Sequence, residues 1–220
     1  RLLAAVNKSL TSRRALPIAA AAVAAALLMG VAVWLLKPAP PPVAEIVTRF
    51  EDELPDGVTL RGTVTSVLDI ARNGEFFVFT GSDGIRLRAM GDSEARVIPG
   101  TGGGVFDVVV SPDNREVAYF RNDRTFQLVK VAINGGAPVV LVDSVAVPFG
   151  MSWESNGTLL YGQPDGIWRV SANGGTPERV IEIEGNERAY GPQLLPGGEW
   201  LLFTLAQTQG PNNPWNGADI

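Results

Sequence analysis

The chain of 220 residues contains no cysteine and no histidine. Without cysteine there is no disulfide framework and no thiol chemistry. Without histidine there is no Ser-His-Asp arrangement, no His-ligated zinc site and no His-Arg-Asp catalytic loop of the protein-kinase type. Residues 1–220 are therefore not expected to form an enzyme, and no catalytic residue or cofactor is predicted.

Phosphate-binding and metal-binding patterns are lacking as well. The glycine-rich stretch Gly100–Gly104 is not followed by the Lys and Ser/Thr of a phosphate-binding loop, so a connecting loop explains it better. The aspartates of the chain do not fall at calcium-loop spacing, and most stand in turn sequences, where Asp hydrogen-bonds the local backbone. No metal site is predicted from these residues: Asp107, Asp113, Asp123, Asp143 and Asp165.

Charge is missing from one long segment, Ala15–Leu36, whose 22 residues are rich in Ala, Val and Leu. As a helix this length crosses roughly 30 Å of hydrocarbon. Pro17 falls in the first turn, where its missing N–H costs little, and Trp34 falls near the far end, where an interfacial indole is favoured. The segment predicts a single transmembrane helix, and the small residues of Ala19–Ala26 leave open whether two such helices pair in a homodimer.

The charges on either side of this segment predict its orientation. Residues 1–14 carry four basic side chains and no acid, whereas the chain after Lys37 carries 13 basic and 23 acidic residues. The positive-inside rule places residues 1–14 in the cytoplasm and the remainder in the periplasm or outside the cell, with the helix in the cell (inner) membrane. A cleavable signal peptide is the alternative, although its apolar region is usually shorter. The acidity of the outer part argues against nucleic acid as its partner.

Two short segments connect the predicted helix to the rest of the chain. Residues 37–43 (KPAPPPV) predict an extended polyproline linker of roughly 3 Å per residue. Ala44–Phe50 predicts a strand that belongs to no complete repeat, and we assign it to the closure of a ring of sheets. The predicted organisation is therefore a cytoplasmic segment 1–14, a transmembrane helix 15–36, a linker 37–43 and an outer domain 44–220.

The outer domain contains a repeat. A turn rich in Asn, Asp or Gly, followed by β-branched and aromatic residues, recurs around Gly74, Asn114, Gly157 and Gly198, at intervals of 40, 43 and 41 residues. This is the pattern of a tight turn leading into a strand. A period of this length without helical segments predicts an all-β fold, a partial β-propeller of about four four-stranded antiparallel blades.

A second pattern recurs with nearly the same period. VAINGGAPVVLV at 131–142 returns as VSANGGTPERVI at 170–181, so that Gly135 and Gly174 stand 39 residues apart. Each copy predicts a strand, an Asn-Gly-Gly hairpin turn and a further strand that begins after a proline. The stretch 87–101 fits the same place in the preceding blade less cleanly.

Together these segments resemble a known family. The succession RFEDELPDG, IARNGEFFVF, IRLRAM, RVIPGT, VVSPDNREVAYF, LVKVAINGGAPVVL, FGMSWESNGTLLYG, GIWRVSANGGTPERV and PQLLPGGEWLLFT is similar to the TolB-like, WD-related propeller that follows the single membrane span of bacterial receptor-type serine/threonine protein kinases. The resemblance covers residues 13–207. It implies a cytoplasmic kinase domain before the span and further blades after residue 207, so the chain is expected to be a fragment of a longer protein.

The chain departs from the family pattern at two turns. Residues 71–74 read ARNG in place of SPDG, and Asn114 stands in place of a glycine. Asn tolerates the left-handed backbone conformation that such a turn requires, so the second change is mild.

Three functions remain open. The first, implied by the resemblance, is an extracytoplasmic sensor or interaction module of a membrane kinase, which binds a protein, a peptide or a glycan across the central funnel of the propeller. The second is the propeller of a prolyl-oligopeptidase-like hydrolase, which a GxSxG motif and a later His would identify. The third is the propeller of a membrane-anchored winged-helix transcriptional regulator.

The candidate ligand-binding residues are Asp107, Ser152 and Gln193. They lie in the predicted innermost strands 105–110, 149–153 and 191–195, where the loops that join successive blades converge. Packing between blades is the competing explanation for each of the three side chains.

Overall fold

A computed structural model of the chain describes residues 21, 23–34, 36, 59, 66–102 and 104–207. The chain divides into two compact units, Arg1–Asp52 and Glu53–Ile220, each treated separately below. In the first unit residues 23–34 are helical. Within the described part of the chain, no helix is long and apolar enough to cross a membrane. Several predictions concern residues that lie outside the described part of the chain. They are those for residues 1–14, for part of the membrane helix 15–36, for the linker 37–43 and for the strand at 44–50.

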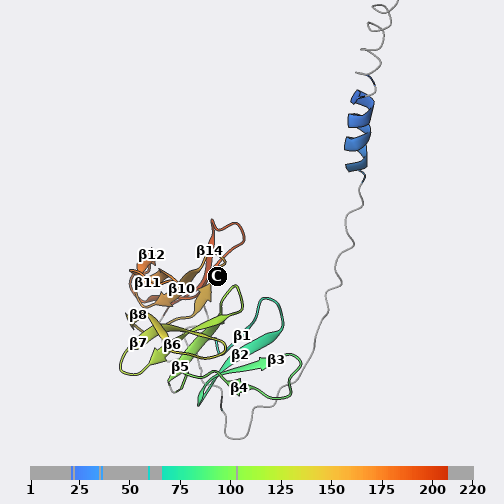
Figure 1. The fold of residues 1–220 in the computed structure, drawn as a ribbon. Helices are drawn as coiled ribbons and strands as arrows, with labels where there is room; N and C mark the ends of the chain where they lie inside the picture. Colours follow the sequence, from blue (N-terminus) through green and yellow to red (C-terminus); the bar gives the residue numbers. More distant parts are fainter. Residues whose placement is uncertain are drawn as a thin grey trace, which may run out of the picture. The chain divides into compact units, whose positions relative to one another are not determined.

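In its described residues the second unit is all-β, as predicted. Over residues 66–207 as described, three four-stranded antiparallel sheets and one two-stranded sheet follow one another, and neighbouring strands in each sheet are consecutive in sequence (Figure 1). We name them blades 1 to 4. Blade 1 contains β1 (Leu68–Ile70), β2 (Phe76–Gly81), β3 (Gly84–Ala89) and β4 (Arg96–Val97). Blade 2 contains β5 (Val105–Val110), β6 (Glu116–Asn122), β7 (Phe126–Ala132) and β8 (Val139–Val145). Blade 3 contains β9 (Met151–Trp153), β10 (Thr158–Gln163), β11 (Gly166–Ser171) and β12 (Glu178–Glu182). Blade 4 contains β13 (Glu187–Leu194) and β14 (Leu201–Gln207).

The four turns of the sequence repeat occupy equivalent places, each between the first and second strands of its blade. Gly74, Asn114, Gly157 and Gly198 all have positive φ, at 70°, 60°, 79° and 76°. In each turn the backbone N–H of this residue donates to the carbonyl three residues earlier, at 2.8 to 3.0 Å. Asn114 therefore replaces glycine in the left-handed region, as the sequence predicted.

The second repeated turn connects the third and fourth strands of blades 2 and 3, also as predicted. Gly135 packs so closely on blade 1 that a Cβ atom there would lie 2.8 Å from the ring of Pro99. Glycine is needed at this position both for its φ of 86° and for this close approach. The corresponding place in blade 1 leads into β4, a strand of only 2 residues, which agrees with the weaker pattern there.

Alternating side chains hold adjacent blades together. Val117 and Tyr119 of β6 join a buried cluster with blade 1, and the intervening Ala118 and Phe120 join a second cluster with blade 3. In the second cluster the rings of Phe120 and Tyr161 meet edge to face, with centroids 6.2 Å apart. The alternation of the strands that follow the four repeated turns predicts one buried face on each of them. Six of the eight residues on these faces are buried and the last two are half-buried: Phe77, Phe79, Val117, Tyr119, Leu159, Tyr161, Leu201 and Phe203.

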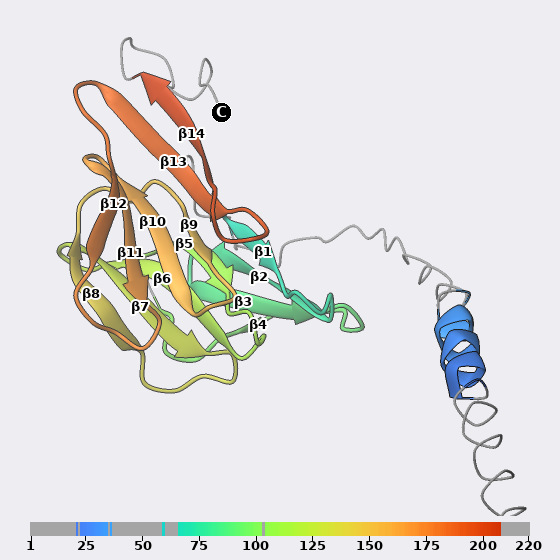
Figure 2. The same ribbon diagram turned by 90° about the horizontal axis from the view of Figure 1, so that it is seen from above.

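The first strand of each blade is the innermost. In the view of Figure 2, β5 and β9 lie side by side in the middle of the unit, whereas β8 and β12 lie at its outer edge. This arrangement is the one in which the blades of a propeller share a central axis.

Candidate functional site

A cavity of about 840 Å³ lies where the innermost strands of the four blades meet. All of β1 and β9 and the last residues of β5 and β13 line it, together with Ser66 before β1, Arg72 after β1 and the turns that follow β9 and β13. It therefore lies at the end of the unit that carries the four repeated turns. The sequence-based hypothesis placed a site at the opposite end, where the loops between blades enter the innermost strands.

Two of the three candidate residues line this cavity. Gln193 of β13 is exposed, and Ser152 of β9 is half-buried and donates from Oγ to Oε1 of Glu154 at 2.7 Å. Asp107 is not among the residues that line the cavity, and it is 0% exposed. The structure therefore brings Ser152 and Gln193 together and separates Asp107 from them.

Asp107 occupies an irregular place in β5. The pairing of β5 with β6 shifts register between Phe106 and Val108, and Asp107 has a φ of 50°. Neither carboxylate oxygen makes a hydrogen bond of good geometry with the described residues. Burial raises the pKa of Asp107 well above its usual value, the neighbouring carboxylate of Asp69 raises it further, and the backbone N–H of Ser66 partly offsets both effects.

Tyr190 of β13 extends this buried group to blade 4. Burial raises the pKa of its phenol, the charge of Asp107 raises it further, and a hydrogen bond with Ser66 lowers it. Asp69, Asp107 and Tyr190 thus come together from three different blades. Among the residues that the structure describes, no set of three or more Asp, Glu, His or Cys side chains could hold a metal ion.

The two carboxylates that do line the cavity connect neighbouring blades. Asp69 Oδ2 accepts from the backbone N–H of Val110 at 2.7 Å, which links blade 1 to blade 2. Glu154 Oε1 accepts from the backbone N–H of Leu194 at 3.2 Å, which links blade 3 to blade 4. The pKa of Asp69 is raised because burial outweighs its backbone hydrogen bonds and the attraction of Arg72.

Arg72 is the one cationic side chain on the described wall of the cavity. Its Nη2 donates to the carbonyl of Trp153 at 2.8 Å, and its Nη1 donates to Oγ of Ser155 at 3.1 Å. Its backbone N–H donates to Oδ1 of Asn114 at 2.9 Å. The turn of blade 1 is therefore hydrogen-bonded to the turns of blades 2 and 3. Sequence reasoning did not select Arg72, although it stands in the turn that departs from the family pattern.

No protein-family model and no curated protein matches this sequence. Among solved structures, the chain is similar to a protein from Agrobacterium tumefaciens assigned as TolB, with 16% identity and a TM-score of 0.52, over 66% of this chain and 59% of that one. It is also similar to an oligogalacturonate lyase solved with manganese, with 11% identity and a TM-score of 0.49, over 66% and 47% of the two chains. A TolB from Acinetobacter baumannii has 11% identity and a TM-score of 0.46, over 61% and 39%.

The likeness to the Agrobacterium protein shows the fold alone, which is a TolB-like β-propeller. The chain spans less than two thirds of the length of these structures. Because one fold hosts many functions, the function has to be argued from the cavity and its residues.

Proposed function

We propose that the second unit is a sensor propeller, which binds a protein, peptide or glycan ligand in the cavity where its innermost strands meet. The observation that carries the proposal is the cavity of about 840 Å³, which four successive blades line. This volume lies within the range of typical ligand sites, and the lining combines apolar side chains with polar and charged ones, among them Asp69, Arg72 and Gln193.

The proposal includes a membrane anchor. Residues 15–36 form the span, residues 1–14 lie in the cytoplasm, and the propeller lies on the opposite side of the cell membrane. The absence of charge over 15–36 and the basic residues before it support this arrangement. The resemblance to receptor-type kinases supports a serine/threonine kinase domain on the cytoplasmic side. The gene sequence upstream of Arg1 tests this last part, because a kinase domain requires a His-Arg-Asp loop and an Asp-Phe-Gly motif there.

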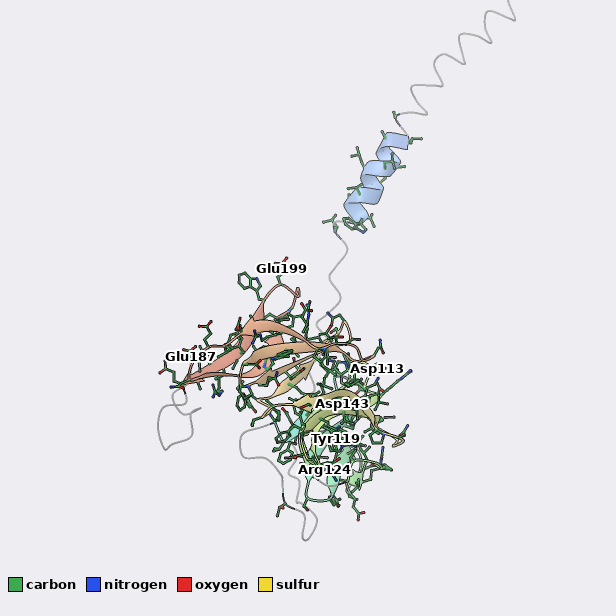
Figure 3. All side chains as sticks on the ribbon, turned by 90° about the vertical axis from the view of Figure 1, so that its left-hand side faces the viewer. Asp113, Tyr119, Arg124, Asp143, Glu187 and Glu199 are labelled. Carbon is green, nitrogen blue, oxygen red and sulfur yellow. The ribbon has the colours of Figure 1, made fainter. Side chains whose placement is uncertain are left out.

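Ligand binding is tested with the whole chain in lipid nanodiscs, titrated with randomised peptide pools and with a set of oligosaccharides. Gln193→Trp adds bulk to an exposed wall of the cavity and should abolish binding of any probe that the natural chain takes up. Asp143→Trp is the matched control, because Asp143 is exposed on β8, the outermost strand of blade 2 (Figure 3). Equal binding by the two variants would show that the cavity is not the ligand site.

A further inference from the structure

We propose that the ligand in this cavity is a peptide with a carboxylate group, and that Arg72 binds that carboxylate. The inference rests on the proposed function and gives the chemical class of its ligand. It starts from the hydrogen-bonding groups on the cavity wall, some of which are already engaged within the protein.

The guanidinium of Arg72 has N–H groups that are not used in hydrogen bonds with the residues that the structure describes. It carries five N–H groups in a planar fork that matches the geometry of a carboxylate. The structure uses one N–H of Nη1 and one of Nη2, for Ser155 and Trp153. Both acceptors are uncharged, and Arg72 forms no ion pair of 4.0 Å or less within the described part of the chain. The two bonds hold the fork in place and leave Nε–H and two further N–H groups for a ligand.

The carboxylates of the wall, in contrast, already accept hydrogen bonds within the protein. Asp69 accepts from Ile70 with Oδ1 and from Val110 with Oδ2. Glu154 accepts two hydrogen bonds on Oε1. With one guanidinium and two carboxylates, the wall has no general attraction for anions. An anion is therefore selected only where it receives directed hydrogen bonds, and the fork of Arg72 is the group that supplies them.

The surroundings of Arg72 indicate a peptide. Asn156 accepts from the Thr158 backbone with Oδ1, which leaves its NH₂ group as the free end on the cavity wall. Leu68 and Ile70 of β1 are 47% and 48% exposed and line the same cavity. The N–H groups of Arg72 can donate to a carboxylate, and apolar side chains lie beside them. This combination fits the C-terminus of a peptide whose last residue is apolar. It fits a uronic acid poorly, because hydroxyl groups surround the carboxylate of that sugar.

The test uses two pools of N-acetylated pentapeptides, randomised except for a C-terminal Leu, one as free acids and one as carboxamides. Each is titrated into the whole chain while the Arg72 Nε–H resonance and the apparent dissociation constant are followed. Binding of the acid pool should be about 10-fold tighter than that of the amide pool, because a charge-assisted bidentate bond is lost in the amide. Arg72→Gln should remove this preference, and Arg72→Lys should retain only part of it.

Arg124→Gln is the matched control. Arg124 is exposed in the turn between β6 and β7, at the opposite end of blade 2 from Asn114, and the preference for acids should persist in that variant (Figure 3). Thermal unfolding of each variant shows whether the fold is intact. Equal binding of the two pools by the natural chain would overturn the carboxylate inference and leave peptide binding standing. Binding of neither pool would overturn the inference and the proposed peptide ligand together, and binding of digalacturonate in place of both pools would assign the site to a sugar acid instead.

Discussion

Asp107 is the residue whose chemistry depends most on the fold. A carboxyl group buried without a good hydrogen-bond partner is costly to ionise, and the adjacent Asp69 makes ionisation more costly still. The folded protein therefore binds the Asp107 proton more tightly than the unfolded chain does. The contribution of Asp107 to the free energy of unfolding is fully present below the unfolded pKa of 3.8. It is lost as the pH rises through the higher pKa of the folded state.

We expect the free energy of unfolding of the natural protein to decrease as the pH rises above about 4, and Asp107→Asn to remove most of this decrease. The amide cannot ionise, and Asn tolerates the φ of 50°. Once the pH exceeds the folded pKa of Asp107, the variant should be more stable than the natural protein, because only the natural protein then has to bury a charge. Urea unfolding at a series of pH values measures both curves. If the free energy of unfolding changed with pH equally in both proteins, the pKa of Asp107 would be the same in the folded and unfolded states.

Gly74→Ala should destabilise the protein by about 1–2 kcal/mol, because a non-glycine residue is strained at a φ of 70°. No atom lies within 4 Å of the added Cβ, so the loss is conformational and not steric. Gly91→Ala is the matched control, since Gly91 also has open space around it and does not have a positive φ. That change should be neutral or stabilising by up to about 1 kcal/mol. Chemical unfolding of the two variants would contradict this account if it gave equal losses.

The strands and turns of each blade were predictable from local sequence. Positive φ at Asn114 follows from an Asn in a turn sequence, and the position of Leu159 and Tyr161 on one face of β10 follows from the alternation of a strand. The burial of Leu160 on the other face does not follow from alternation, because it requires a second blade to pack there. The contacts of Arg72 were not predictable in this way, because its partners Trp153 and Ser155 are 81 and 83 residues distant. Such contacts depend on the angle between blades, which no local pattern encodes.

Local sequence patterns also predicted only part of the candidate site. Ser152 and Gln193 were selected because they lie in innermost strands, and both line the cavity. Asp107 was selected on the same ground, yet the register shift beside it in β5 accompanies a side chain that is buried and away from the cavity wall. Strict alternation cannot foresee a bulge, because one extra residue reverses the face of the side chains that follow.

Glu154 provides a test of the connections between elements. Removing its carboxylate in Glu154→Ala leaves the Leu194 N–H without its acceptor, which costs about 0.5–1.5 kcal/mol because this bond is only partly buried. Amide exchange at Leu194 and along β13 should become faster, whereas β6 should keep its protection. Glu154→Gln keeps an acceptor oxygen at the same place and should show a smaller effect. Unchanged exchange in β13 of the Ala variant would mean that this bond does not hold blade 4.

At the scale of the whole molecule, we expect the chain to cross the cell membrane once. In spheroplasts, a protease added from outside should cut in residues 37–43 or near Gly102 and Gln209, while an epitope on residues 1–14 stays protected. Lysis should make that epitope accessible and serves as the control. Digestion of the N-terminal epitope in intact spheroplasts would contradict the proposed orientation.

The central claim is that the innermost strands of the four blades and the turns of blades 1, 3 and 4 surround one cavity, where the turn of blade 1 contacts the turn of blade 3. A double-mutant cycle between Arg72→Met and Ser155→Ala measures that contact directly as a coupling in the free energy of unfolding. The Arg72 Nη1 to Ser155 Oγ hydrogen bond predicts a coupling of about 0.5–1 kcal/mol. The control cycle of Arg72→Met with Asp143→Ala should be additive within about 0.3 kcal/mol. A coupling between Arg72 and Ser155 no larger than that of the control pair would contradict the arrangement of blades on which the site depends.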